Sequence, residues 1–177
     1  RGSIGEELRV QVSTISLQIA GVRVDLATSR PELPGLSRYR PFAGAAGPAR
    51  WTIELRSAPA RPEALPGRSV LEREGRWRIA GAEEAGWVDP VGRTGAVCSD
   101  PGLLYLDTLL RSMVGAQLLS RGGLLVHGAA VVVDGAAHLF PARSRAGKST
   151  LAALAGHPLS DEVSVLEPGP GGFLAHA

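Results

Sequence analysis

Near the end of the sequence, a glycine, a lysine and two hydroxyl residues stand in an order typical of a phosphate-binding loop. Residues 142–149 read ARSRAGKS and match the second half of the motif G-x-x-x-x-G-K-[ST]. In such a loop, backbone N–H groups surround an anion, the lysine neutralises phosphate charge and the next hydroxyl helps to bind Mg²⁺. The candidate nucleotide-binding residues are therefore Ala142, Arg143, Ser144, Arg145, Ala146, Gly147, Lys148, Ser149 and Thr150.

Two features of this loop bear on whether it binds phosphate. Lys148 is the sole lysine of the chain, and a compact ammonium fits between phosphates differently from the planar guanidinium of arginine. Glycine is usual, however, where Ala142 and Arg145 stand. If Arg145 adopts a positive φ, its Cβ costs on the order of 1 kcal/mol. The alternative interpretation is a helix start rich in small residues that binds no ligand.

Three further side chains could act together with the loop. Asp161 and Glu162 follow it by a few residues, and a carboxylate beside a phosphate loop can bind Mg²⁺ or act as general base on an acceptor hydroxyl. Adjacent residues of a strand point to opposite faces, so these two need not share a role, and a solvated turn is the alternative. His127 lies in the apolar run LLVHGAA, either as a core residue or as a partner that tunes the basicity of Asp161.

The hydrophobic pattern indicates which elements would position these residues. Two apolar runs over residues 124–140 flank Asp134-Gly135, a dipeptide typical of a hairpin turn. Residues 148–156 predict a short helix that ends in glycine, and residues 158–168 predict another strand. The resulting order of strand, loop, helix and strand is the context that a phosphate loop requires.

The first hundred residues predict a small, mostly antiparallel β layer. Residues 8–26 and 69–81 alternate apolar and polar positions on both sides of a central turn, which indicates two hairpins. Short strands are expected at 51–56 and 95–99.

Two helical segments are expected besides the one after the loop. Residues 36–42 predict a short helical turn that places Tyr39 and Phe42 in the core. Residues 99–123 predict a longer helix, because apolar residues recur on one face and glycines follow it. The residues of this apolar face are Leu103, Leu104, Leu106, Leu109, Leu110, Met113, Val114, Gln117 and Leu118.

The stretch over residues 127–166 resembles the catalytic core of HPr kinase/phosphorylase and its kinase-like relatives. That family has a His-Gly pair on a strand, then a turn with glycine, a phosphate loop, a helix and an acidic pair. The residues that match in the same order are His127-Gly128, Asp134-Gly135, Gly147-Lys148-Ser149, Gly156-His157 and Asp161-Glu162. The acidic pair of the family is usually two aspartates, so Glu162 is a departure.

The resemblance implies a fold class and a domain organisation. The fold would be α/β or α+β, with a P-loop core of the type shared by HPr kinase and ATP-dependent phosphoenolpyruvate carboxykinase. We expect a β-rich N-terminal region over residues 1–98 and a helix plus the kinase-like core over residues 99–177. The family's later segments would lie beyond residue 177, so this core is expected to be incomplete.

The same resemblance implies a role for each matching residue. Lys148 and the loop amides would bind the phosphates of ATP, and Ser149 and Glu162 would bind Mg²⁺. Asp161 would accept the proton of the acceptor hydroxyl, with His127 as its partner.

The function that follows is an ATP-dependent phosphotransferase, a serine kinase acting on a hydroxyl of a protein or peptide. One alternative is a non-catalytic module with a degenerate kinase-like fold that binds a nucleotide or a partner. Chemistry like that of phosphoenolpyruvate carboxykinase is a third interpretation, but the substrate-binding arginine and metal-ligand motifs it needs are not evident.

Composition limits the class of protein. The net charge of +2 contains no block of like charge that would follow a nucleic acid. No apolar run approaches the ~20 residues of a membrane span. The single cysteine, Cys98, cannot form an internal disulfide, which favours a reducing compartment and a cytoplasmic protein. The sequence leaves the identity of the acceptor and homo-oligomerisation open.

Overall fold

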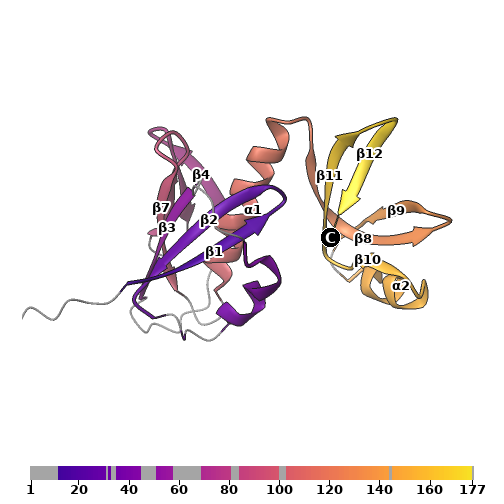
Figure 1. Cartoon of the computed structure of the whole chain (residues 1–177), viewed down its shortest axis with the longest axis horizontal. Helices are drawn as coiled ribbons and strands as arrows, with labels where there is room; N and C mark the ends of the chain where they lie inside the picture. The colour runs from indigo at the N-terminus through magenta and orange to yellow at the C-terminus, as the bar shows by residue number, and fades with distance from the viewer. Residues whose placement is uncertain are drawn as a thin grey trace, which may run out of the picture. The chain divides into compact units, whose positions relative to one another are not determined.

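The computed structural model describes residues 12–30, 32, 35–44, 51–57, 69–80, 84–99, 103–143 and 145–176 (Figure 1). The chain divides into two compact units, residues 1–110 and 111–177. The division falls inside the helix α1 (Leu104–Leu119). The boundary predicted from the sequence, at residues 98 and 99, lies at the end of a strand upstream of this helix. The fold is α+β and consists mostly of strands.

In its described part, the first unit forms a seven-stranded mixed sheet in the order β1-β2-β3-β7-β6-β5-β4. The interior strand β3 pairs in parallel with both β2 and β7, and all other pairs are antiparallel. The strands are β1 (Ser13–Ile19), β2 (Val22–Thr28), β3 (Trp51–Ser57), β4 (Ser69–Arg73), β5 (Arg76–Ala80), β6 (Glu84–Asp89) and β7 (Thr94–Ser99).

Both predicted hairpins of this unit are confirmed. β1 turns into β2 at Ala20-Gly21, and β4 turns into β5 at Glu74-Gly75. All four turn residues have positive φ, which matches the right-handed twist of the flanking strands. The strands at 51–56 and 95–99 are confirmed as β3 and β7, whereas β6 was not predicted, because its sequence EAGWVD shows no alternation.

One face of this sheet carries the core of the first unit. The alternation in β2 buries every second residue, as expected for a strand with one face toward the core. Fully or nearly buried side chains of the same face continue across the neighbouring strands and the start of α1. They are Val22, Val24, Leu26, Ile53, Leu55, Ile79, Val88, Val97, Leu103, Leu106 and Leu109.

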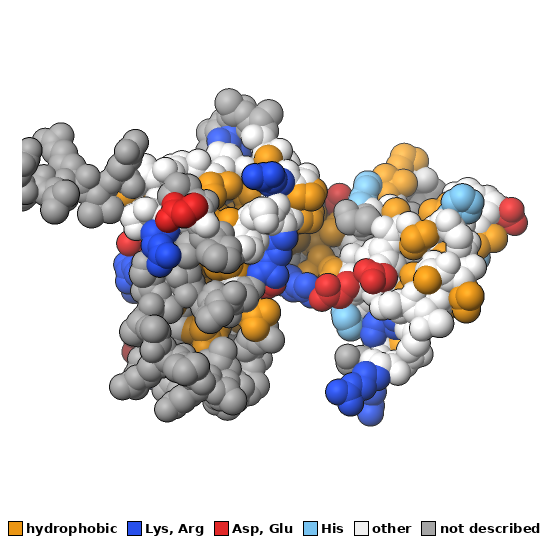
Figure 2. All heavy atoms as spheres, turned by 90° about the horizontal axis from the view of Figure 1, so that it is seen from below, with side chains coloured by type: hydrophobic (Ala, Val, Ile, Leu, Met, Phe, Trp, Pro, Cys, Tyr) orange, Lys and Arg blue, Asp and Glu red, His pale blue; other side chains and the backbone are white. Residues whose placement is uncertain are grey.

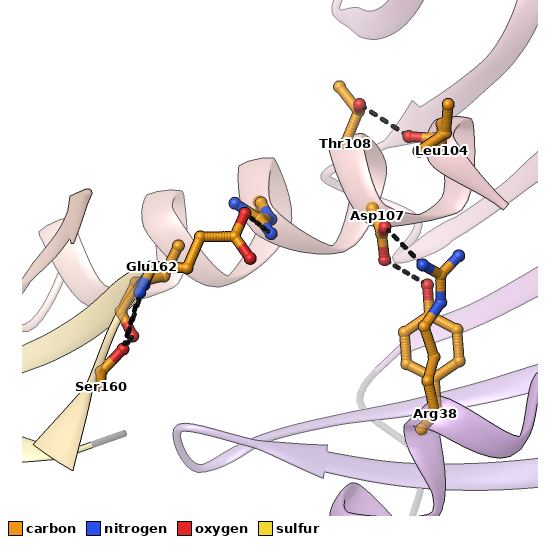
Figure 3. Close-up of polar contacts among 9 residues, drawn as sticks. Arg38, Leu104, Asp107, Thr108, Ser160 and Glu162 are labelled. Carbon is orange, nitrogen blue, oxygen red and sulfur yellow. Dashed lines mark hydrogen bonds and ion pairs between the residues drawn. The ribbon is translucent and has the colours of Figure 1, made fainter. Parts of the chain in front are cut away.

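The 3₁₀ helix η1 (Leu36–Phe42) confirms the predicted helical turn, but only one of its two aromatic residues is in the core. Tyr39 is buried, whereas Phe42 is 38% exposed. The Tyr39 hydroxyl donates a hydrogen bond to Asp107, and the other oxygen of Asp107 lies 3.4 Å from Arg38 (Figure 3). Burial and then the bond to Asp107 raise the pKa of the Tyr39 phenol, so it remains a protonated donor. This contact ties η1 to the first turn of α1.

Of the helix predicted over 99–123, residues 100–102 lie outside the described part of the chain; α1 covers Leu104–Leu119 and so ends earlier than predicted. Its predicted apolar face is largely confirmed, because most of these side chains are buried; Leu104 and Gln117 are half-buried. No helix among the described residues is both long enough and apolar enough to cross a membrane.

The second unit is built around the long strand β8 (Leu124–Val133). β9 (Ala136–Pro141) pairs with it after a turn at Asp134-Gly135, which confirms the predicted hairpin. The helix α2 (Lys148–Leu154) is followed by Gly156 at positive φ, as expected. The remaining elements are β10 (Pro158–Ser160), β11 (Val163–Gly169) and β12 (Gly172–His176).

Part of the apolar surface of this second unit remains uncovered by the residues that the structure describes. Hydrophobic side chains appear on the surface in Figure 2, among charged ones of both signs. The large exposed apolar residues of this unit include Leu124, Val132, Val133, Phe140, Leu154, Phe173 and Leu174.

Candidate functional site

The glycine-containing loop lies in a crossover between two strands that run in the same direction. β9 and β10 both pair antiparallel with β8, and Ala130 of β8 faces Leu139 on one side and Ser160 on the other. β9 and β10 therefore occupy opposite edges of β8. The loop and α2 connect them across β8, and α2 packs on β8 and β10 with Ala152 buried. The loop begins at the carboxyl end of β9.

The acidic pair lies at the corresponding end of β10. Gly128 of β8 pairs with Pro141, the last residue of β9, and its N–H donates to the carbonyl of Glu162 at 3.0 Å. Pro141, Gly128 and Glu162 thus form one row that crosses β9, β8 and the segment between β10 and β11. Because neighbouring strands are about 4.8 Å apart, the start of the loop and the acidic pair are separated by roughly 10 Å, with Gly128 of β8 between them.

The loop itself is curled, and the ammonium of Lys148 closes it. Lys148 Nζ donates to the carbonyl oxygens of Ala142 and Arg143, both at 2.9 Å. The N–H of Ala146 donates back to the carbonyl of Arg143 at 3.3 Å, and Gly147 has φ 85°. The predicted phosphate loop is therefore not extended, and the side chain of Lys148 contacts the first two residues of the loop.

The other predicted loop residues are accessible to a ligand. Arg143, Arg145, Ala146, Ser149 and Thr150 are all exposed, and the last two belong to the first turn of α2. Ser144 lies outside the described residues.

Arg145 adopts a left-handed backbone conformation with φ 66°, in which its Cβ is strained. We expect Arg145→Gly to raise the free energy of unfolding by up to about 1 kcal/mol, because glycine reaches this conformation without strain although it adds freedom to the unfolded chain. Arg145→Ala is the matched control, since it removes the same charge and keeps the Cβ. Urea unfolding measures both variants, and equal stabilities would show that the strain is negligible.

The two acidic residues differ in their surroundings. The carboxylate of Glu162 accepts a hydrogen bond from Arg111 of α1 at 2.7 Å (Figure 3). Asp161 is exposed, and none of the described residues forms a hydrogen bond or ion pair with its side chain. Glu162, expected to bind Mg²⁺, is therefore already engaged by a cation, whereas Asp161 is open to a ligand.

The residues present could bind Mg²⁺ only together with substrate phosphates and water. No group of three or more His, Cys, Asp or Glu residues in the described ranges could hold a metal ion by itself. Mg²⁺ is usually bound through one or two protein oxygens together with substrate phosphates and water, so a full protein cage is not required. The Ser149 hydroxyl at the loop and the Asp161 carboxylate supply oxygens of the right kind.

His127 is exposed, which argues against a buried core histidine. It pairs with Val163 across the ladder, and the same register puts Asp161 opposite Ala129, diagonal to His127. Such diagonal neighbours are about 7–8 Å apart, within reach of long side chains. Within the described structure no hydrogen bond joins His127 to Asp161, so their partnership stays a prediction.

Gly128 fills a position where a side chain has no room. A Cβ at this residue would lie 2.9 Å from the carbonyl oxygen of Phe140 and 3.0 Å from the Cα of Pro141, both backbone atoms of β9. We expect Gly128→Ala to lower the free energy of unfolding by about 1–3 kcal/mol, because β9 must move away from β8 where the loop starts. Gly115→Ala in α1 is the control, since nothing lies within 4 Å of its Cβ. Thermal unfolding measures the stability of both variants, and an equal change in the two would contradict this expectation.

Two residues of this region were not identified from the sequence. Arg111 looks like an ordinary polar position on an amphipathic helix, and nothing local connects it to Glu162. Ser160 looks like part of a turn, yet its hydroxyl contacts three backbone groups of Glu162 and Val163. The spacing of Ser160 before the acidic pair was the one available hint, because serine hydroxyls often bond to backbone two or three residues away.

Comparison with known proteins adds no assignment to this geometry. No protein-family model matches the chain, and no curated protein matches it.

Proposed function

We propose that the chain binds the phosphates of ATP at the loop Ala142 to Thr150 and transfers a phosphoryl group to a hydroxyl of a protein or peptide. One observation carries the proposal: the loop and Asp161 follow two strands that run in the same direction on opposite edges of β8, so that both lie near the level of Gly128. We further propose that the second unit is a P-loop core of the HPr kinase type. The loop, helix and acidic pair in this crossover support that assignment.

The ammonium of Lys148 is suited to the donor nucleotide. In the structure it contacts two carbonyl oxygens of the loop, and phosphate oxygens would be stronger acceptors at the same position. Phosphoryl transfer depends mainly on positioning and on neutralising the charge of the transferred group. Lys148 would do this from inside the loop, and the exposed guanidinium groups of Arg143 and Arg145 would add positive charge at its rim.

Asp161 is suited to act on the acceptor. Its free carboxylate would take the proton of the acceptor hydroxyl while the hydroxyl oxygen bonds to the terminal phosphorus and the bond from phosphorus to the leaving diphosphate breaks. His127, diagonal to Asp161, would be the partner of this carboxylate. Mg²⁺ bound through Ser149 would neutralise the phosphates.

Calorimetric titration with ATP and Mg²⁺ tests the first part of the proposal, and transfer of labelled γ-phosphate to serine and threonine peptides tests the second. We expect both binding and transfer. Absence of ATP binding would end the proposal, and ATP binding without transfer to any peptide would exclude the kinase.

A non-catalytic nucleotide-binding module is the second candidate, and the pairing of Glu162 with Arg111 favours it. With Glu162 engaged, the described site has one free carboxylate instead of two. In such a module, substitution of Asp161 would leave the affinity for ATP unchanged, and neither the variant nor the wild type would transfer phosphate.

A cytoplasmic location belongs to the same proposal. ATP is the donor, and the chain carries one cysteine, Cys98, which is not in a disulfide. The partner of the chain would be the protein or peptide that supplies the acceptor hydroxyl.

A further inference from the structure

We infer that Ser160 is a positioning residue: its hydroxyl forms the bend that presents Asp161, while Arg111 holds Glu162 away from the reacting groups. The catalytic consequence rests on the proposed function, whereas the structural role does not. The acidic bend is defined as residues 160–163.

The acidic bend interrupts the ladder along β8. Ser160 faces Ala130 and Val163 faces His127, so the residues on the two sides of the bend share one register, although the register shifts earlier, between Pro158 and Ser160. The register of the flanking residues alone therefore does not require a bend at residues 161 and 162. Something local must favour the bend instead.

The Ser160 hydroxyl supplies that preference. In an antiparallel hydrogen-bonded pair, the two residues exchange both of their N–H···O bonds. Gly128 donates to the carbonyl of Glu162 at 3.0 Å, but the N–H of Glu162 donates to Ser160 Oγ at 3.3 Å instead of returning to Gly128. The side chain of Ser160 thus replaces one bond of the ladder.

The same hydroxyl also closes the far side of the bend. It donates to the carbonyl of Val163 at 2.7 Å and accepts the N–H of Val163 at 3.2 Å. One small side chain therefore satisfies three backbone groups at residues 162 and 163. Since the two backbone groups of Val163 are half-buried and groups without partners are costly there, loss of the hydroxyl should release the bend.

The bend separates the two carboxylates. Glu162 reaches Arg111 at 2.7 Å, and Asp161 keeps a side chain that no described residue engages. Through its three contacts, the Ser160 hydroxyl holds the backbone from which both carboxylates project. A catalytic carboxylate gains from such fixation, because small displacements of a reacting group cost about 100-fold in rate.

The test compares Ser160→Ala with Ser160→Thr, which keeps the hydroxyl. We expect Ser160→Ala to accelerate amide hydrogen exchange of Glu162 and Val163 by about tenfold or more, and Ser160→Thr to remain close to the wild type. Ser120→Ala is the matched control, since Ser120 also donates to a backbone carbonyl, that of Gln117, but lies outside the bend. Unchanged exchange in Ser160→Ala would overturn the inference.

The kinetic arm measures transfer on the whole chain. We expect Ser160→Ala to lower kcat about 10- to 100-fold with the KM for ATP unchanged, and Ser160→Thr to restore kcat. A general loss of structure would instead change kcat and KM together in both variants, which would overturn the positioning role. If the wild-type chain binds ATP and transfers no phosphate, the proposed function fails, and the exchange experiment alone decides the role of Ser160.

Discussion

Lys148→Ala is expected to weaken ATP binding by about 100-fold or more. The substitution removes the only ammonium side chain of the chain, and a charge-assisted bond to phosphate is worth about 1.5–3 kcal/mol before the additional loss of loop closure. It also removes the two bonds to Ala142 and Arg143 that hold the loop in its curled form. Calorimetric titration with ATP and Mg²⁺ measures the loss.

Two controls separate the causes of this loss. Lys148→Arg keeps the charge but presents a planar guanidinium, so it should recover only part of the affinity if the compact shape of the ammonium matters. Arg145→Ala removes a neighbouring exposed charge without opening the loop and should weaken binding far less. If Lys148→Ala and the wild type bind ATP equally, the assignment of the phosphate loop is wrong.

Asp161→Asn is expected to lower kcat for phosphate transfer by about 10²–10⁴-fold, the usual contribution of a general base. The amide has nearly the same shape as the carboxylate but cannot accept the proton of the acceptor hydroxyl. Because Lys148 and the loop are untouched, the dissociation constant for ATP should stay within a few-fold of the wild type. Single-turnover transfer of labelled phosphate, together with an ATP titration, measures both quantities.

Glu162→Gln is the matched control for Asp161→Asn. The two substitutions remove equal charges from adjacent residues, yet Glu162 is engaged by Arg111 and is expected to contribute much less to the chemical step. A larger effect at Glu162 than at Asp161 would reverse the two roles. Equal and small effects at both residues would favour the non-catalytic module.

The local features of the fold were predictable because their causes are local. Each of the three predicted hairpin turns is set by two residues that adopt positive φ, as Asp134-Gly135 does between β8 and β9. The apolar face of α1 follows from spacing alone. Phe42 was wrongly placed in the core, because helical spacing cannot tell which residues of a single turn meet the rest of the unit.

The long-range features were not predictable. Nothing in the sequence of β3 indicates that both its neighbours run parallel to it, since the partners are distant segments. At the site, the curled loop follows from its own residues, including the lysine that closes it. The engagement of Glu162 depends on Arg111, which is 51 residues away in the sequence, and so only the structure reveals it.

The parallel environment of β3 has a consequence for how the first unit folds. β1 with β2, and β4 through β7, are successive antiparallel segments that can zip together from their turns. No turn joins β3 directly to either group. We expect β3 to pair last, between β2 and β7, because two distant chain segments must first be brought together at an entropic cost. We therefore expect the refolding rate of the first unit to be limited by the arrival of this one strand, and substitutions in β3 to slow refolding more than substitutions in either outer hairpin.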